Sequence, residues 1–416
     1  MNLVDLYLEY LPPSIAELLG RALDMVFATA PYWLPVALLF LAVDLWYRAM
    51  RATYIAAMDW ALLEVRLPTE ILKSPAAMEV AYTIFHQTST GTWYDRWWKG
   101  RVVPWFSLEL ASLEGSVHFF IRTERRFSKL IEAHIYAQYP EVQITEVDDY
   151  VKSVNYSPES EWKLHGLELQ FTKPDAYPIR TYIDYELDKE RREDASKVDP
   201  IASTIEFLGS VGKDEQIWIQ ILVRASQPRF RVKDSRFKKQ SWKDEGIALV
   251  KELRKRETKP GEMVLYHEKL LSPGEERVMK GIQRNLGKLG FDCGIRAIYF
   301  GKGDAFQKMR IPGLIMSFKQ YNAEDSNGFK PHGEFKTDFD YPWQDYKNVR
   351  LNRKKRKIFN AYRLRSYFYG PYPRHPFVLS SEELATIYHF PGAVLRTPTF
   401  HRVLSKTSEA PGNLPR

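Results

Sequence analysis

The residues best suited to chemistry form a basic run, RLNRKKRK at positions 350–357, with six Lys or Arg residues in eight. The run continues into an aromatic and basic stretch, IFNAYRLRSYFYGPYPR. Cations that neutralise phosphates, interleaved with rings that stack on bases, are what single-stranded nucleic-acid binding uses. The same cations suit anionic lipid on a cytoplasmic leaflet or an acidic partner protein. The sequence predicts an anionic partner and leaves lipid, protein and DNA or RNA open. The candidate binding residues are Arg350, Arg353, Lys354, Lys355, Arg356 and Lys357.

Motifs for catalysis or nucleotide binding are not found in the sequence. A phosphate-binding loop needs G-x-x-x-x-G-K-[ST], so that backbone N–H groups surround phosphate and the hydroxyl reaches Mg²⁺. The nearest fragments are GSVGKDE (209–215) and GKGD (301–304), and both lack the hydroxyl residue and the glycine spacing. We therefore interpret them as turns and expect no catalytic residue, no cofactor and no ATPase core in this chain.

The sequence also gives no clear pattern for a metal site or for an acid–base site. The nine histidines show neither H-x-H nor H-E-x-x-H spacing, so no metal site is predicted. Asp148 and Asp149 are adjacent, which favours a solvated turn over a catalytic pair. Cys293 is the single cysteine and lies in a strand-like segment, which predicts a buried, inert thiol.

The elements that position these residues begin with an uncharged run of 19 residues from Met25 to Val43. Roughly 20 apolar residues cross a hydrocarbon core of ~30 Å, so the run predicts a single transmembrane helix. Prolines are tolerated in a first turn, so we expect the regular helix to begin near Pro31 and to continue to about Tyr54. The expected membrane-interface residues are Trp33, Trp46, Tyr47, Arg48 and Arg51.

The flanks of this run predict its orientation. Acidic residues dominate before it, whereas Arg48 and Arg51 follow it. The positive-inside rule places the N-terminus outside and the later domains in the cytoplasm, with a single pass through the cytoplasmic (inner) membrane. A buried hairpin of a soluble domain is the alternative. The acidic start and the absence of a small-x-small site disfavour a cleaved signal peptide. SIAELLGRAL (14–23) predicts a short amphipathic helix on the outer face.

After this membrane anchor (1–55), the predicted fold class is α+β. Residues 59–155 show the order β-α-β-β-α-β, which predicts a ferredoxin-like domain. Ser74 is expected to cap its first helix, and Glu114-Gly115 indicates a hairpin.

Residues 160–322 predict a second αβ domain, in which 177–187 pairs as a strand, Asp199 caps a helix and 304–321 forms a helix. A charged insertion (229–259) in this domain is expected to contain a helix and to project into solvent. Residues 323–416 predict an irregular basic and aromatic C-terminal region with a linker-like tail, apart from a short helix capped by Ser380 and Glu383.

Composition is compatible with this organisation. The chain has 416 residues, 44% of them hydrophobic, which is enough for substantial cores. The net charge of +8 suits an anionic partner without requiring one.

Several long strings resemble a known family. They include LEVRLPTEILKSPAAMEV, WWKGRVVPWFSLELASLEGSVHFFIRT, LIEAHIYAQYPEVQITEVDDYV, KPDAYPIRTYIDYELDKE, KVDPIASTIEFLGS, EQIWIQILVRA and SSEELATIYHFPG. Together they resemble the membrane-anchored N-terminal region attached to, or encoded beside, type IV secretion ATPases of the conjugative coupling-protein kind. The resemblance spans about Trp60 to Pro415 and includes no catalytic motif.

The resemblance implies a partner. In longer relatives a stretch like SKTSEAPGNLP leads into a P-loop ATPase domain, so here we expect a separately encoded hexameric P-loop ATPase. We expect Arg416 to mark a break between two genes. A hexameric motor would favour several copies of this chain, arranged as a homo-oligomer. The first hypothesis is a non-catalytic, membrane-anchored scaffold of a type IV secretion-like apparatus. The alternatives are a nucleic-acid-binding membrane protein that contacts DNA or RNA, and an enzyme of unknown type.

Overall fold

The computed structural model describes residues 13–68, 73–188, 198–228, 230–231, 239–254, 271–339 and 341–392. It divides into two compact units. One comprises Met1–Met58 with Thr90–Val102, and the other comprises Asp59–Ser89 with Val103–Arg416. Helices and antiparallel strands are mixed, which confirms the predicted class at that level.

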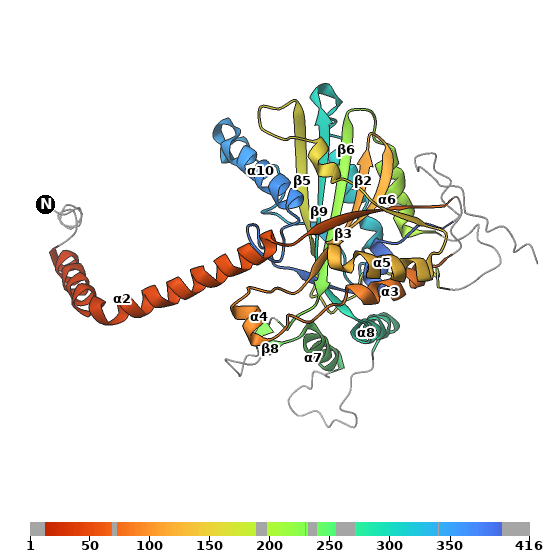
Figure 1. The fold of residues 1–416 in the computed structure, drawn as a ribbon. Coiled ribbons are helices and arrows are strands. Elements are labelled where there is room, and N and C mark those ends of the chain that lie inside the picture. The colour runs from red at the N-terminus through yellow and green to blue at the C-terminus, as the bar shows by residue number, and fades with distance from the viewer. Residues whose placement is uncertain are drawn as a thin grey trace, which may run out of the picture. The chain divides into compact units, whose positions relative to one another are not determined.

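The first unit is built on one long helix, α2 (Pro13–Ala56), accompanied by the short helix α4 (Trp93–Trp97). The expected start near Pro31 is wrong, because α2 already runs through that position and contains both Pro31 and Pro35. The short amphipathic helix predicted near the N-terminus is likewise part of α2. Each proline removes one backbone donor without ending an otherwise apolar helix, and proline is a usual cause of kinks. Figure 1 shows α2 as two straight stretches joined by a bend.

The second unit contains a nine-stranded sheet whose paired strands are all antiparallel. Eight strands follow one path across it, and β11 (Phe377–Ser380) pairs with β9 beside this path. In spatial order the eight are β10 (Phe329–Pro331), β5 (Trp162–Phe171), β9 (Gly290–Lys302), β6 (Glu215–Ala225), β2 (Trp105–Leu113), β3 (Ser116–Glu124), β1 (Trp60–Arg66) and β4 (Gln143–Glu146).

The two segments expected as separate αβ domains share this sheet. When the strands of each segment are numbered along the chain, both segments run 4-1-3-2 across the sheet, and they meet at their second strands, β2 and β6. The β2–β6 register extends from Trp105↔Arg224 to Leu113↔Gln216. The two segments that we expected to be separate domains are therefore joined by a long hydrogen-bonded strand pair.

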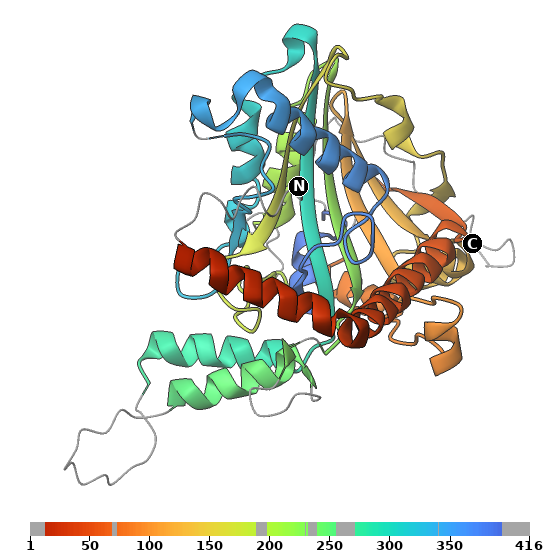
Figure 2. The same cartoon turned by 90° about the vertical axis from the view of Figure 1, so that its left-hand side faces the viewer.

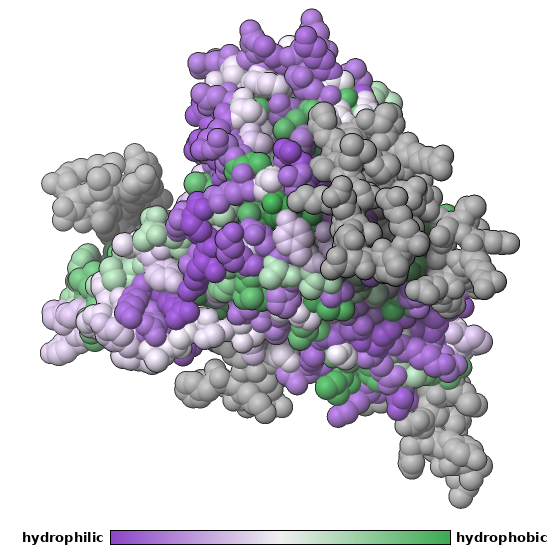
Figure 3. Space-filling view, turned by 45° about the vertical axis from the view of Figure 1, so that its right-hand side comes forward, coloured by the Kyte–Doolittle hydropathy of each residue, from purple (hydrophilic) through white to green (hydrophobic). Residues whose placement is uncertain are grey.

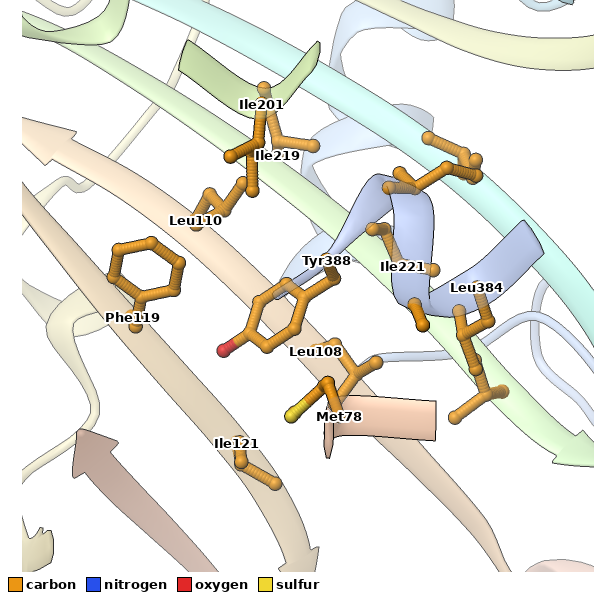
Figure 4. Packing of buried hydrophobic residues seen from close by; sticks show 14 of the residues in the cluster. Met78, Leu108, Leu110, Phe119, Ile121, Ile201, Ile219, Ile221, Leu384 and Tyr388 are labelled. Atoms are coloured by element: carbon orange, nitrogen blue, oxygen red, sulfur yellow. The ribbon is translucent and has the colours of Figure 1, made fainter. Parts of the chain in front are cut away.

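Helices cover both faces of the sheet (Figure 1). The main core lies beneath α3 (Pro75–Ala81), α5 (Arg125–Gln138), α6 (Pro200–Gly209) and α11 (Ser381–Ile387). Figure 4 shows Met78 of α3 and Leu384 of α11 against strand residues such as Leu108 and Ile221. The opposite face packs against α10 (Val349–Arg363) and the turn at Tyr150–Ser153.

The remaining elements lie in the second half of the chain. They are β7 (Phe230–Arg231), β8 (Lys239–Gln240), α7 (Trp242–Arg254), α8 (Pro273–Leu286) and α9 (Arg310–Met316). Helices α7 and α8 lie side by side in both ribbon views (Figures 1 and 2). The charged insertion therefore contains a helix, as expected, and that helix packs on α8.

Local signals confirm several predicted ends. Ser74 and Asp199 cap α3 and α6 and are each followed by a proline, while Ser380 and Glu383 form the capping box of α11. The hairpin at Glu114-Gly115 has φ values of 53° and 90°. A side chain on Gly115 would place its Cβ 2.6 Å from the Val211 carbonyl oxygen, so glycine is required there.

Two predicted elements of the second segment differ. Residues 177–187 form turns and irregular backbone instead of a strand, because side chains of the α11 segment accept two of their backbone N–H groups and most of the others bond locally. Ile179 N–H donates to Glu383 at 2.9 Å and Tyr182 N–H donates to Thr386 at 3.0 Å. The helix expected over 304–321 is regular only in α9 and is flanked by turns and 3₁₀ segments.

Candidate membrane and anion-binding surfaces

The predicted basic run lies on α10, a regular helix within a region that we expected to be irregular. Asp345 accepts the first backbone donors, from Arg350 at 2.9 Å and Leu351 at 2.7 Å. A carboxylate at this end also interacts favourably with the helix dipole. Ile358 fills the space above Gly166 of β5, where a Cβ would lie 2.9 Å from its Cδ1. Apolar residues at Leu351, Ile358, Phe359 and Tyr362 are the helical signal that the sequence interpretation missed.

The structure separates the six basic residues by environment. Arg350, Arg353, Arg356 and Lys357 are exposed, whereas Lys354 and Lys355 are half-buried. Arg350 donates to the Gln344 carbonyl at 2.9 Å, and Lys354 lies 4.5 Å from the centre of the Phe339 ring. Burial lowers the pKa of Lys355. Lys355 therefore faces the protein more than the solvent.

Three exposed cations of α10 have no counter-ion among the residues that the structure describes. Within the described ranges, no carboxylate lies at ion-pair distance from Arg353, Arg356 or Lys357. Their spacing of three, four and one residues keeps them on neighbouring exposed positions of the helix. An unneutralised cationic stripe of this kind attracts anionic surfaces at long range.

A cavity of about 500 Å³ lies beside α10, with Leu164, His165, Thr337 and Lys355 among its lining residues. Burial lowers the pKa of His165 to about 4. Its Nδ1 is 3.4 Å from the Thr337 hydroxyl, which in turn accepts the Gly166 N–H at 2.7 Å. The imidazole is therefore neutral near pH 7, and its hydrogen bonding is local and structural.

A buried charged network lies on the same face of the sheet as α10, and sequence reasoning did not detect it. Arg365 donates to both carboxylate oxygens of Glu109, at 2.9 and 3.0 Å, and to Asp149 at 2.9 Å. Tyr150 and Gln220 also donate to Glu109, at 2.8 and 3.0 Å. Burial disfavours the charged form of Glu109, but Arg365 outweighs this effect and the pKa falls to about 2. The carboxylate is fully satisfied and is not available as a proton acceptor.

This network corrects the interpretation of Asp149 as part of a solvated turn. Asp149 pairs with Arg365, a residue that is fully buried and has a positive φ of 49°. A single arginine in an aromatic-rich stretch gave no sequence signal for burial. Of the two adjacent aspartates, Asp149 therefore forms a structural ion pair.

The interface residues predicted on α2 are all helical. Arg48 pairs with Asp44 at 2.7 Å, and the Arg51 guanidinium lies 4.0 Å from the centre of the Tyr47 ring. Trp46 and Tyr47 also contact rings of the 90–102 segment. Trp33 lies thirteen residues before Trp46, which is about 20 Å of helix. The ring contacts therefore group Trp46 and Tyr47, without Trp33, at the C-terminal end of the apolar run.

The described residues include one helix that is long and apolar enough to cross a membrane. It spans Gly20–Ala56 within α2, its most apolar 18-residue window has a mean hydropathy of 1.9, and none of that window is buried. A signal sequence meets the same criteria of length and composition. On the face drawn in Figure 3, by contrast, hydrophobic residues form small groups within a largely hydrophilic surface.

The remaining sequence candidates are structural. GSVGKDE forms the turn between α6 and β6, and GKGD ends β9, as expected for turns. Cys293 is buried in β9, as predicted. Across the described ranges, no group of three His, Cys, Asp or Glu side chains is arranged to hold a metal ion.

These features define a class: an α+β body with one continuous antiparallel sheet, preceded by a long apolar helix. The chain belongs to the family described as a domain of unknown function (DUF8128), whose model matches residues 59–402. The match covers the whole sheet and the basic helix. No curated protein matches the chain significantly.

Proposed function

We propose that this chain is a membrane-anchored, non-catalytic subunit of a translocation apparatus resembling type IV secretion systems. The observation that carries this proposal is α2, a helix long and apolar enough to span a bilayer and unburied along its apolar window. Such a surface is costly in water, whereas lipid covers it without any polar loss, since the helix satisfies its own backbone. Arg48 and Arg51 support an orientation with the αβ body in the cytoplasm, at the inner membrane.

The body supports a scaffolding role. We infer that each segment of the sheet is a ferredoxin-like unit, since each contributes strands in the order 4-1-3-2 with neighbouring strands antiparallel. The two ferredoxin-like segments are joined through β2 and β6 and make one wide sheet with helices on both faces. A rigid layered body of this size offers broad surfaces for docking other proteins.

The docked partner in this proposal is a separately encoded hexameric P-loop ATPase. This assignment rests on the resemblance to regions that precede such ATPases, and a hexameric partner would favour several copies of this chain. The exposed cations of α10 supply a surface of suitable charge for an acidic partner face.

Site-specific photo-crosslinking in the native membrane tests the proposal. A crosslinker at Arg353 on α10 is compared with one at Lys129, which is also exposed and lies on α5. We expect the Arg353 position to capture a P-loop ATPase and the Lys129 position to capture much less. Recovery of the full-length chain in the alkaline-soluble fraction would contradict the anchor, and capture of no ATPase from either position would contradict the docking role.

One observation favours a second candidate, nucleic-acid binding. Arg353, Arg356 and Lys357 have no carboxylate partner among the described residues, and aromatic residues follow them in the chain. Cations of this kind release counter-ions when they contact phosphates, which makes binding strongly dependent on salt.

A further inference from the structure

The segment 90–102 carries a short, well-braced helix. Thr92 and Asp95 form a capping box around α4, and Lys99 pairs with Asp95 at 2.9 Å. These bonds, the Lys99 contact first, lower the pKa of Asp95. Arg101 N–H donates to the Asp95 carbonyl at 2.9 Å, which closes the turn after the helix. The segment therefore presents its side chains from a defined backbone.

This segment docks closely on the C-terminal part of α2, within the same compact unit. Gly100 is buried with a φ of +68°, and a Cβ there would lie 2.4 Å from the Met50 carbonyl oxygen. Trp98 meets Trp46 edge to face with ring centres 5.3 Å apart. Trp97 stacks on Tyr47 with centres 4.8 Å apart. Only glycine permits this approach of two backbones, so the docking is specific.

Four of the six residues from 93 to 98 are large aromatics that remain accessible despite this docking. Their exposed fractions are 64% for Trp93, 52% for Tyr94, 38% for Trp97 and 57% for Trp98. Rings with an apolar body and a polar N–H or O–H are the residues enriched where hydrocarbon meets water. A cluster of exposed rings on a rigid loop is therefore suited to a membrane interface.

The position of the aromatic cluster along α2 matches the expected level of the membrane interface. The uncharged run ends at Val43, and the ring contacts are made by Trp46 and Tyr47. Three to four residues of helix correspond to about 5 Å, which is the headgroup side of the hydrocarbon boundary. Arg96 and Lys99 are exposed on the same segment, where phosphate groups of lipids would lie.

We propose that residues 90–102 form a second membrane contact, an interfacial aromatic anchor that binds phospholipid headgroups in the leaflet where α2 emerges. This inference rests on the proposed insertion of α2. The anchor sets the depth of the helix, because rings docked on Trp46 and Tyr47 resist movement either into the hydrocarbon or out into water. A lipid surface fits better than a protein partner, because the cluster is continuous with the unburied apolar helix.

Depth-dependent quenching in bilayers tests the anchor in the full-length chain. Cys293 is fully buried, so the unaltered chain serves as the labelling blank. Trp93→Cys, Phe40→Cys and Met309→Cys each receive an environment-sensitive fluorophore. The chain is placed in phosphatidylcholine–phosphatidylglycerol bilayers whose acyl chains carry bromine near the headgroup or near the terminal methyl. Phe40 reports on the apolar part of α2, and Met309, which is 82% exposed, reports on the αβ body.

We expect shallow bromines to quench position 93, deep bromines to quench position 40, and neither to quench position 309. Quenching at 40 without quenching at 93 would overturn the interfacial anchor and leave the membrane helix intact. Absence of quenching at 40 would overturn the membrane proposal itself. If lipid does not quench position 93 and aqueous iodide does not reach it, a protein surface covers the cluster and the lipid assignment is wrong.

A backbone variant tests whether docking places the rings. Gly100→Ala combines an unfavourable φ with the clash at Met50, whereas Gly274→Ala on α8 meets nothing within 4 Å. We expect Gly100→Ala to abolish shallow quenching at position 93 and to preserve deep quenching at position 40. Gly274→Ala should change neither signal. If Gly100→Ala does not accumulate, Trp98→Ala removes the contact with Trp46 without backbone strain, and unchanged quenching in that variant would contradict the proposed placement.

Discussion

The guanidinium of Arg365 meets the carboxylate of Glu109 through two nearly parallel hydrogen bonds, 2.9 Å from Nε to Oε1 and 3.0 Å from Nη2 to Oε2. Both side chains are completely buried, and 256 residues separate them in the chain. The pair attaches the segment after α10 to strand β2 at the centre of the sheet.

Removing both members of this pair should destabilise the protein by less than the sum of the two single removals. Arg365→Met leaves the Glu109 carboxylate buried without its main partner, which typically costs about 3–5 kcal/mol. Glu109→Gln combined with Arg365→Met should cost less than the sum of the single variants. Urea unfolding of the detergent-purified chain, followed by tryptophan fluorescence, measures both values. Additive single-variant losses would contradict a coupled pair.

Acid should remove the contribution of Glu109. Its folded pKa of about 2 lies below the ordinary value of 4.5, so the stabilisation is present above pH 4.5 and is lost as pH falls towards 2. Urea midpoints measured over this range should decline more steeply in the wild-type chain than in Glu109→Gln. Parallel curves would show that the carboxylate is not preferentially ionised in the folded state.

His165 should add a separate pH dependence at higher pH. Its folded pKa of about 4 lies below the ordinary 6.5, so the unfolded chain takes up the proton first and stability falls as pH drops from 6.5 to 4. The difference corresponds to up to about 3 kcal/mol. Asp338, Lys336 and Lys355 face the ring, and burial is the larger cause of the shift. His165→Gln should flatten the curve in this window, while His375→Gln at an exposed position should not.

Gly294 should not accept a side chain. A Cβ at this position of β9 would lie 2.1 Å from the ring of Tyr367, which packs directly on the strand. Gly294→Ala should cost about 1–3 kcal/mol through overpacking, and the second change Tyr367→Leu should restore part of it. Thermal unfolding gives the comparison. No rescue by the second change would indicate that backbone conformation, not the ring, requires glycine.

The cationic stripe of α10 should control binding to anionic polymers. Arg353→Gln, Arg356→Gln and Lys357→Gln together should weaken binding of single-stranded DNA and reduce the slope of affinity against salt by roughly two to three. The matched control replaces Lys129, Lys213 and Lys251, which are also exposed. Equal losses of affinity in both triple variants would show that net charge alone causes the effect. Binding that does not depend on salt would exclude phosphate contact.

Much of the local structure could be predicted because its causes are local. Ser74, Asp199 and Ser380 each cap the helix that follows, and the hydrogen bond that makes the cap involves residues only two or three positions away. The same reasoning identified the Glu114-Gly115 hairpin, where two neighbouring residues take positive φ.

The joining of the two halves could not be predicted in this way. Strand β6 pairs with all nine residues of β2, yet each strand has the apolar sequence of any buried strand, and that sequence does not identify its partner. Glu109 illustrates the difficulty for the buried network. It sits in an otherwise apolar strand, and its partner Arg365 follows a helix whose charged half dominated the interpretation of that region.

The β2–β6 pair also has a consequence for how the chain is made. Ala225, the last residue of β6, is synthesised 112 residues after Leu113, the last residue of β2. At roughly 5–20 residues per second, this leaves β2 without its neighbour β6 for about 6 to 22 seconds. An unpaired strand edge is a template for association with other chains. During this interval, newly made copies that lie close together are therefore at greatest risk of pairing with each other.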